Sequence, residues 1–341
     1  MNRLPSTDKL LTDAIEYTPD KIDAASWDHL LAAASNATPF HNLGWIRSIY
    51  ETYPSIKVGV LVVKNEDGYL GGFPYTIRKK YGFLQWLDSL LFGTYGGPIL
   101  HKNASPEVSR VLWNSFQRIA RSSIDAVRIR DFHNSLQLEP RQGYQPRTVF
   151  THRIPLHHDY DHLHKKIYTH NVRKMIRQSH DKGIYIEKVT TEEDVKEYVN
   201  IAYHTLKRHG SKLYPEMFFL NLFRHMGEHC LYHLAYHDGR AVAGTIHFVQ
   251  GDSVYTWLPA SYPEFWNLRP NNALVDHVIR WAVEHEKMWY DFGGGPSRNQ
   301  NLINYKESFG AMRYDYCLWE WDSRFVRMLR KLHGRKVGSV S

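Results

Sequence analysis

The order of predicted secondary structure most limits what this chain can fold into. A strand, a hairpin turn, a second strand, a helix and another strand occur once in residues 57–129 and again in residues 231–290. Both hairpins carry an Asp-Gly turn, at Asp67-Gly68 and Asp238-Gly239, which is a strong local signal for two adjacent antiparallel strands. Strands and helices in this order favour a mixed sheet covered by helices. The sequence therefore predicts an α/β protein containing two copies of one mixed α/β unit.

Chain length also favours two domains. The 341 residues are 43% hydrophobic, which is enough to bury more than one core. A segment with two prolines and a glycine, residues 139–146, marks the predicted boundary. We therefore expect a first domain in residues 1–150 and a second in residues 151–321, followed by a basic helix in residues 322–341.

Charge and cysteine content restrict the function classes. The net charge of +8 favours anionic partners such as nucleotides, phosphorylated carriers or RNA. Cys230 and Cys317 lie in strand-like runs and predict neither a disulfide framework nor a metal site, and the 21 histidines match no zinc spacing. We therefore expect no bound metal. No apolar run has the length of a signal or transmembrane segment, so we also expect a cytoplasmic protein.

The strongest candidate for a site is the stretch 288–310. An apolar strand stops at Asp291, a loop with three consecutive glycines and a proline follows, and Tyr305 and Lys306 stand at the start of another ordered element. A rigid strand end with an acid, followed by a loop that permits close approach of a ligand, is typical of a functional site.

Several motifs of the second half together resemble one known family. They are Asn171-Val172-Arg173-Lys174 in a basic helix predicted over residues 161–182, Thr205 to Arg208, the Asp238-Gly239 hairpin, Asp291-Phe292-Gly293, Tyr305-Lys306 and Phe309-Gly310. This order over residues 160–321 resembles the Fem family of aminoacyltransferases, within the GNAT superfamily. Trp45 and the Asp67-Gly68 hairpin are similar to that family's first domain.

The resemblance implies a fold and a reaction. The fold would be two tandem GNAT-like domains with a cleft between them, and the last helix would return to the first domain. The reaction would be acyl transfer to an amine, from an aminoacyl-tRNA ester or a thioester. Members of the family add amino acids to peptidoglycan precursors, which implies a role in cell wall biogenesis and an acceptor that is a small molecule or linked to a nucleotide.

Three residues of the candidate stretch suit this chemistry. Attack of an amine on a carbonyl creates an oxyanion, for which Lys306 is the best candidate donor. Tyr305 is a second donor or assists the departing oxygen. Asp291 is the candidate acceptor for the proton of the amine, and its alternative role is to anchor the loop. These are the predicted catalytic residues.

Further polar residues are candidates for substrate binding. The predicted set is Asn171, Arg173 and Arg177 on the basic helix, Arg208 on the next helix, Arg298 in the glycine-rich loop, and Arg47, which the resemblance implies as a contact for a nucleotide-linked acceptor. The alternative for each arginine is an ordinary solvent-exposed charge.

The choice of donor depends on a helix start, which we expect near Asn271 or Asn272. Acyl-CoA sites place glycines before such a helix so that backbone amides bind the pyrophosphate, whereas here Arg269 and Pro270 occupy that junction. We therefore expect no tightly bound cofactor and prefer aminoacyl-tRNA as co-substrate. The alternatives are an acyl-CoA-dependent N-acyltransferase of polysaccharide or secondary metabolism, and a non-catalytic protein that binds RNA or a nucleotide sugar.

Overall fold

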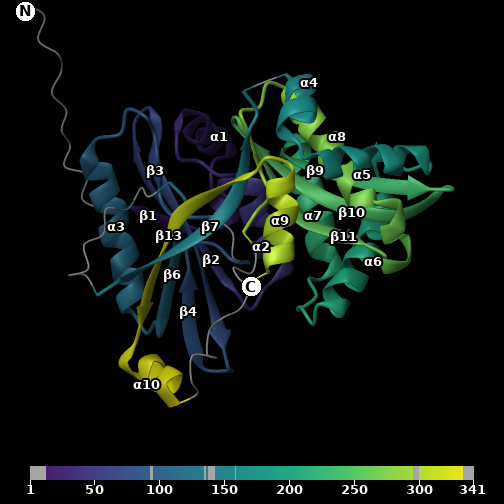
Figure 1. Cartoon of the computed structure of the whole chain (residues 1–341). Coiled ribbons are helices and arrows are strands. Elements are labelled where there is room, and N and C mark those ends of the chain that lie inside the picture. Colours follow the sequence, from purple (N-terminus) through teal and green to yellow (C-terminus); the bar gives the residue numbers. More distant parts are fainter. Residues whose placement is uncertain are drawn as a thin grey trace, which may run out of the picture. The chain divides into compact units, whose positions relative to one another are not determined.

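The chain forms two compact units in the computed structural model. The model describes residues 13–92, 95–133, 136, 143–157, 159–294 and 299–332. The first unit comprises Met1–Thr148 with Tyr316–Ser341, and the second comprises Val149–Asp315. Each unit contains strands and helices, which are described here unit by unit (Figure 1).

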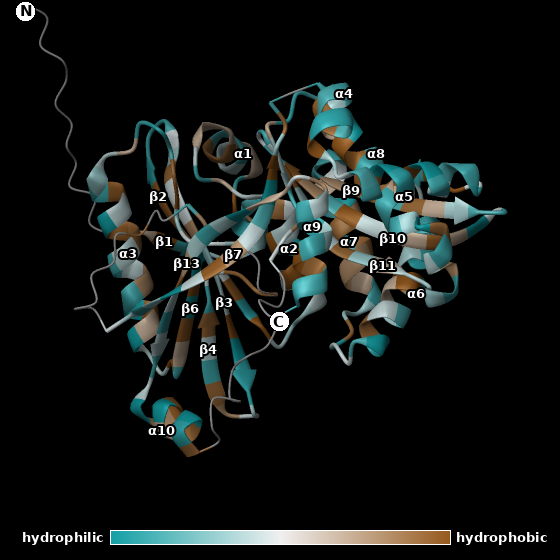
Figure 2. Ribbon diagram, in the orientation of Figure 1, coloured by the Kyte–Doolittle hydropathy of each residue, from teal (hydrophilic) through white to brown (hydrophobic). Residues whose placement is uncertain are grey.

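The strands of the first unit pair in the order β1-β2-β3-β4-β6-β13. Its strands are β1 (Ile15–Tyr17), β2 (Lys57–Asn65), β3 (Gly68–Lys80), β4 (Leu84–Asp88), β6 (Ala126–Asp131) and β13 (Met312–Asp322), and β5 (Ile99–Leu100) pairs with β3. Neighbours are antiparallel except β4 and β6, which run parallel. Figure 2 shows the hydrophobic residues along these strands in brown.

One helix supplies much of the core of the first unit. The helices here are α1 (Ala24–Ala33), α2 (Leu43–Thr52), α3 (Pro106–Arg121) and α10 (Arg324–Leu332). Leucine, valine and phenylalanine recur on one side of α3, so that side is buried against β2 and β3. Phe116 of α3 stacks on Phe73 of β3 with ring centroids 4.3 Å apart, which fixes the helix on the sheet.

The strands of the second unit pair in the order β7-β12-β11-β10-β9-β8. Its strands are β7 (Gln145–Pro155), β8 (Tyr185–Lys188), β9 (Cys230–His237), β10 (Arg240–Gln250), β11 (Ser253–Ser261) and β12 (Trp289–Asp291). Its helices are α4 (Tyr160–His162), α5 (His170–Asp181), α6 (Glu192–Arg208), α7 (Glu216–Met226), α8 (Pro270–Glu284) and α9 (Gln300–Ser308). Only β11 and β12 run parallel among the described pairs, and α8 connects them.

Three local predictions were wrong. The basic helix expected over residues 161–182 is interrupted, because a π-turn over Leu163–Ile167 ends at Tyr168 and the Thr169 side chain caps the new helix α5. Residues 145–155, read partly as a linker, form β7. Tyr305 and Lys306 were expected at the start of an ordered element, but they lie near the end of helix α9. Within the described residues, none of the helices has the length and hydrophobicity to cross a membrane.

Candidate active site

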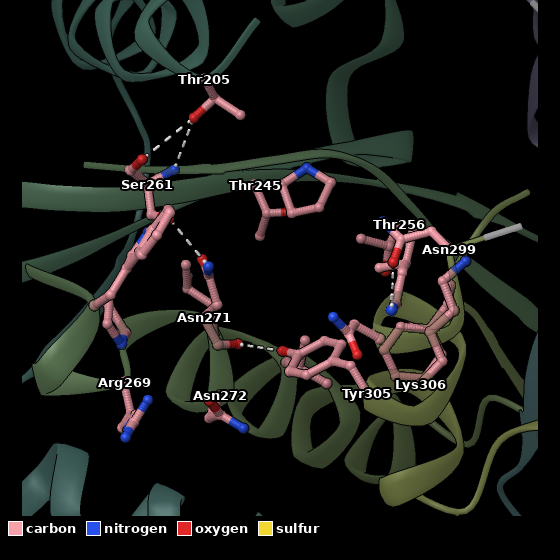
Figure 3. A pocket seen from close by; sticks show the side chains of 18 of the residues that line it. Thr205, Thr245, Thr256, Ser261, Arg269, Asn271, Asn272, Asn299, Tyr305 and Lys306 are labelled. Carbon is pink, nitrogen blue, oxygen red and sulfur yellow. Dashed lines mark hydrogen bonds between the residues drawn. The ribbon is translucent and has the colours of Figure 1, made fainter. Parts of the chain in front are cut away.

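A cavity of about 1010 Å³ lies in the second unit, where two parallel strands stop pairing (Figure 3). The last paired residues are Tyr255 of β11 and Asp291 of β12. Strand β11 continues to Ser261 whereas β12 ends, so β11 exposes polar edge groups that β12 does not cover. Residues of α6, β10, β11, α8 and α9 line the space.

Lys306 is the buried cation of this cavity. Its side chain is only 5% exposed, and its Nζ donates a hydrogen bond to the carbonyl oxygen of Gly293 at 2.5 Å. Burial lowers the pKa of Lys306 to about 8, and the nearby Asp291 carboxylate opposes that shift. The ammonium has three N–H donors, so the contact with Gly293 leaves others able to bind a ligand oxygen.

Asp291 is not among the residues that line the cavity, although its charge acts on Lys306. Its Oδ1 accepts a hydrogen bond from the Thr151 hydroxyl at 2.6 Å and another from the Gly293 N–H at 2.8 Å. Its Oδ2 lies 3.7 Å from Nε of Arg153. These contacts hold the end of β12 and the start of the following loop, which is the geometry of the alternative role as a loop anchor.

Gly293 has a backbone conformation that the site requires. Its φ angle is +71°, and an added Cβ would lie 2.9 Å from the Tyr255 hydroxyl oxygen and 3.0 Å from the Thr256 carbonyl oxygen. Only glycine meets both conditions without strain. The turn directs the Gly293 carbonyl to Lys306 and thereby fixes the lysine side chain.

Tyr305 and the start of α8 form another part of the cavity wall. The Tyr305 hydroxyl donates to the backbone oxygen of Asn271 at 3.2 Å, and burial raises its pKa. Asn271 Nδ2 donates to Ser261 Oγ at 3.1 Å. Asn271 Oδ1 and Asn272 Nδ2 are buried and have no hydrogen-bond partner among the described residues. A bound polar group would satisfy them.

The start of α8 differs from the predicted one. Arg269 is the N-cap residue, with a left-handed φ of +62°, and Pro270 is the first helical residue. Asn271 and Asn272 therefore lie inside the first turn instead of capping it. Proline at this position is favourable for the helix because the first N–H groups have no partner within it.

The predicted substrate-binding residues are only partly brought together. Arg208 is exposed at the cavity. Its Nη1 lies 3.4 Å from the backbone oxygen of Ser261, and its guanidinium lies 4.9 Å from the Trp266 ring centroid. Arg173 instead donates to backbone oxygens of Lys165 and Tyr168 at 2.9 and 2.7 Å, closing the end of the π-turn.

The others are found elsewhere on the chain. Asn171 and Arg177 are exposed on α5 and do not line the cavity. Arg47 belongs to the first unit, where its Nε donates to the Pro19 oxygen at 3.3 Å. Arg298 lies outside the described residues.

Sequence reasoning missed a group of neutral polar residues of the cavity. These are Thr205, Thr245, Thr256, Ser261, Asn271, Asn272 and Asn299, which Figure 3 shows around the open space with Lys306 and Tyr305. Thr245 and Thr256 are buried polar residues within otherwise apolar strands, and that interruption was the available signal.

Comparison with known proteins identifies the class. Residues 168–307 match the family model described as an acetyltransferase (GNAT) domain. Every residue named above as lining the cavity falls in that range, so the second unit contains a GNAT-type acyltransferase domain. No curated protein matches the sequence significantly.

Solved structures define the fold more closely. The structure of FemX is 14% identical and covers 93% of this chain and 99% of its own, with a TM-score of 0.71. L-PGS from Bacillus licheniformis is 13% identical, covers 93% of this chain and 98% of its own, and has a TM-score of 0.59. A tandem GNAT protein from the clavulanic acid biosynthesis pathway is 12% identical, covers 91% of this chain and 98% of its own, and has a TM-score of 0.53. The chain therefore has a Fem-like GNAT fold, which confirms the predicted α/β class and the resemblance.

Proposed function

We propose that this acyltransferase moves an aminoacyl group from an activated ester, with aminoacyl-tRNA as the preferred donor, to the amine of a small or nucleotide-linked acceptor. The observation that carries the proposal is the buried Lys306 ammonium in a cavity whose wall also contains neutral hydrogen-bonding side chains and the arginines Arg208 and Arg269. Because Lys306 is buried, water screens its charge poorly, so the charge acts strongly on an oxyanion.

In the proposed reaction the acceptor nitrogen attacks the ester carbonyl. The C–N bond forms, the carbonyl oxygen becomes an oxyanion, and a Lys306 N–H donates to it. Collapse breaks the ester C–O bond, and the proton lost by the amine ends on the departing ribose oxygen, so the products are an amide and an alcohol. Tyr305 lies on the cavity wall beside Lys306 and is the candidate donor for the departing oxygen.

The start of α8 is the candidate place for a polar group of a substrate. Asn272 is 6% exposed and its Nδ2 has no partner among the described residues, while the free N–H groups of a helix start favour negative charge. This feature also favours the second candidate, an acyl-CoA-dependent N-acyltransferase. Pro270, which has no N–H at that start, favours the aminoacyl-tRNA reading instead.

The deciding experiment measures thermal unfolding of the purified protein with charged tRNA, a UDP-linked muropeptide, acetyl-CoA and longer acyl-CoA esters. A ligand that binds only the folded state raises the melting temperature. A rise with charged tRNA or the muropeptide and none with the CoA esters supports the proposal. A rise with a CoA ester alone overturns the donor assignment. Binding of tRNA should also weaken steeply as salt increases.

A second measurement separates an enzyme from a binding protein. We expect Lys306→Ala to abolish product formation and leave donor affinity within a few fold, whereas Lys174→Ala, which removes an exposed lysine of α5, changes neither. No turnover in the parent protein, together with lost affinity in Lys306→Ala, would indicate a non-catalytic binder.

A further inference from the structure

A second surface, on the first unit, carries exposed apolar side chains that the proposed reaction does not use. Residues 81–83 form the turn between β3 and β4, because Lys80 and Leu84 are the last paired residues. Tyr81 and Phe83 are 63% and 60% exposed at this turn. Phe325 of α10 packs its ring 6.2 Å from that of Phe83, which joins turn and helix into one patch.

Helix α10 exposes an apolar side instead of burying it. Phe325, Met328 and Leu332 are 43%, 51% and 72% exposed, and their spacing of three and four residues places them on one side of the helix. Val326 alone is fully buried on this helix. Figure 2 shows α10 with both brown and teal residues. We call Tyr81, Phe83, Phe325, Met328 and Leu332 the apolar patch.

Cations flank the apolar patch. Arg324, Arg327 and Lys331 are exposed and also recur every three or four residues, which places them on the side of α10 next to the apolar one. Residues 324–341 contain six lysines and arginines and no carboxylate side chain. Lys80, beside the turn, has a pKa lowered to about 8, mainly by burial and then by the positive charges of Arg78, Arg128 and Arg330.

The neighbouring carboxylates do not neutralise these exposed cations. Asp322 accepts from Arg128 Nη2 at 2.6 Å and pairs with Arg330 Nε at 3.2 Å. Asp88 pairs with Arg78 Nε at 3.0 Å. Both carboxylates are therefore engaged by inner arginines, and the outer row of charges remains uncompensated among the described residues.

The turn that carries the two exposed rings has a strained backbone. Tyr81 has a φ of +53°, a left-handed conformation that is unfavourable for a bulky residue, and Gly82 follows with +80°. Such strain persists where the surrounding structure imposes it and is common at binding sites.

From these observations we propose that the apolar patch and its flanking cations bind an anionic lipid surface. Aromatic and aliphatic side chains enter the boundary between headgroups and acyl chains, and the row of arginines and lysines meets the lipid phosphates. A second copy of this chain fits less well, because a symmetric contact through the same patch would bring two rows of positive charge together. The inference is independent of the proposed reaction, since no residue of the cavity takes part.

The test is co-sedimentation of the full chain with vesicles of phosphatidylcholine alone and of an equal mixture of phosphatidylcholine and phosphatidylglycerol. We expect binding to the mixed vesicles only, weakened by salt because exposed charges are screened. The triple variant Arg324→Glu, Arg327→Glu, Lys331→Glu should bind at least a hundredfold more weakly, at about fivefold per lost cation. The double variant Phe83→Ser, Phe325→Ser should also lose binding.

Matched controls keep the proposal open to refutation. Met312→Ser removes a residue that is 57% exposed at the end of β13 farthest along the chain from α10, and Lys174→Glu reverses an exposed charge of α5, so both should bind like the parent protein. Circular dichroism confirms that each variant is folded. Equal binding to neutral vesicles, no binding to either kind, or unchanged binding of the triple variant overturns the proposal. Self-association that the double variant abolishes would overturn it in favour of a second copy.

Discussion

Among the described strands of each unit one pair runs parallel, β4 with β6 and β11 with β12, and the second strand of each pair ends at an aspartate that a phenylalanine follows. In the first unit β6 ends at Asp131 and Phe132 follows, whereas in the second β12 ends at Asp291 and Phe292 follows. Both aspartates are buried and accept a backbone N–H of a later residue, from Leu136 at 2.7 Å and from Gly293 at 2.8 Å. The shared carboxylate is thus explained by the fold.

The units differ in what lies beside that strand end. In the first unit Phe132 stacks on Tyr95 with centroids 4.1 Å apart, and Tyr316 packs against both rings. In the second unit Phe292 lines the cavity with Lys306. The comparison indicates that the aspartate secures the strand end in both units, and that in the second unit a buried lysine and a cavity lie beside it.

The largest effect is expected at Lys306. Lys306→Met keeps the volume of the side chain and removes its charge, so kcat/KM should fall by about a hundredfold to a thousandfold. If the ammonium is the donor, activity of the parent protein should also fall as pH rises through about 8, because the pKa of Lys306 is lowered to that value and the charge is lost above it. Activity that instead rises through this pH would make Lys306 a base.

The next effect separates the two roles of Asp291. Asp291→Asn removes the negative charge whose Oδ2 lies 3.7 Å from Arg153 Nε and should cost about 3 kcal/mol of unfolding free energy. Asp131→Asn should cost about 2 kcal/mol, because the buried N–H of Leu136 exchanges a charged acceptor for a weaker neutral one. Urea unfolding measures both.

Residual turnover, assayed where the variants remain folded, completes that comparison. We expect Asp291→Asn to keep activity within tenfold of the parent, as an anchor would. A loss as large as that of Lys306→Met would make Asp291 the proton acceptor. The two aspartates would then share only their structural role.

A smaller effect is expected at Gly293, whose counterpart two residues after Asp131 is His133. Gly293→Ala should cost about 2 kcal/mol, because φ is +71° and the Cβ would contact Tyr255 and Thr256. The control Gly239→Ala has a similar φ of +74° but open space, and should cost about 1 kcal/mol. Equal losses of stability in the two variants would show that the left-handed backbone conformation alone, without contact of the Cβ with Tyr255 and Thr256, limits this position.

The sequence was informative where local chemistry determines structure. The periodicity of α3 and the Asp-Gly hairpins predicted these elements closely, and the strand end at Asp291 pointed to Lys306 and Tyr305, which the structure places in one cavity. Each of these signals depends on residues close in the chain. They do not require knowledge of which strands pair.

The failures have physical causes. Arg173 was proposed as a substrate contact because it lies on a predicted basic helix, whereas in the structure its guanidinium donates to backbone oxygens at the end of the π-turn, which the sequence pattern did not reveal. The threonines of β10 and β11 were missed because the place where β11 and β12 stop pairing depends on the strand register. The start of β7 was missed because residues 139–146, with two prolines and a glycine, were read as the domain boundary.

The last prediction compares the buried histidines of the two units; among the described residues, more of them lie in the second unit. Burial lowers the pKa of His233 to about 3 and that of His247 well below its usual value, and the two rings lie 5.6 Å apart. His277 lies 5.3 Å from His233 and is shifted in the same direction. In the first unit, burial lowers the pKa of His41 to about 4.

These shifts fix the sign of the acid response. Below about pH 6.5 the unfolded chain binds protons that the buried, neutral histidines do not, so stability falls as pH decreases towards the folded pKa values. Each such group contributes about 1.4 kcal/mol per pH unit in that window. The second unit should therefore lose stability faster than the first. Amide hydrogen exchange between pH 7 and pH 5, read separately for β10 and β3, measures the loss of stability per pH unit in each unit.

His233→Phe should reduce this dependence on pH only in the second unit. The control His170→Phe, at an exposed position of α5, should change it in neither unit. Equal slopes in the two units would mean that water reaches His233 and His247, and that the second sheet is less tightly closed around them than their burial indicates.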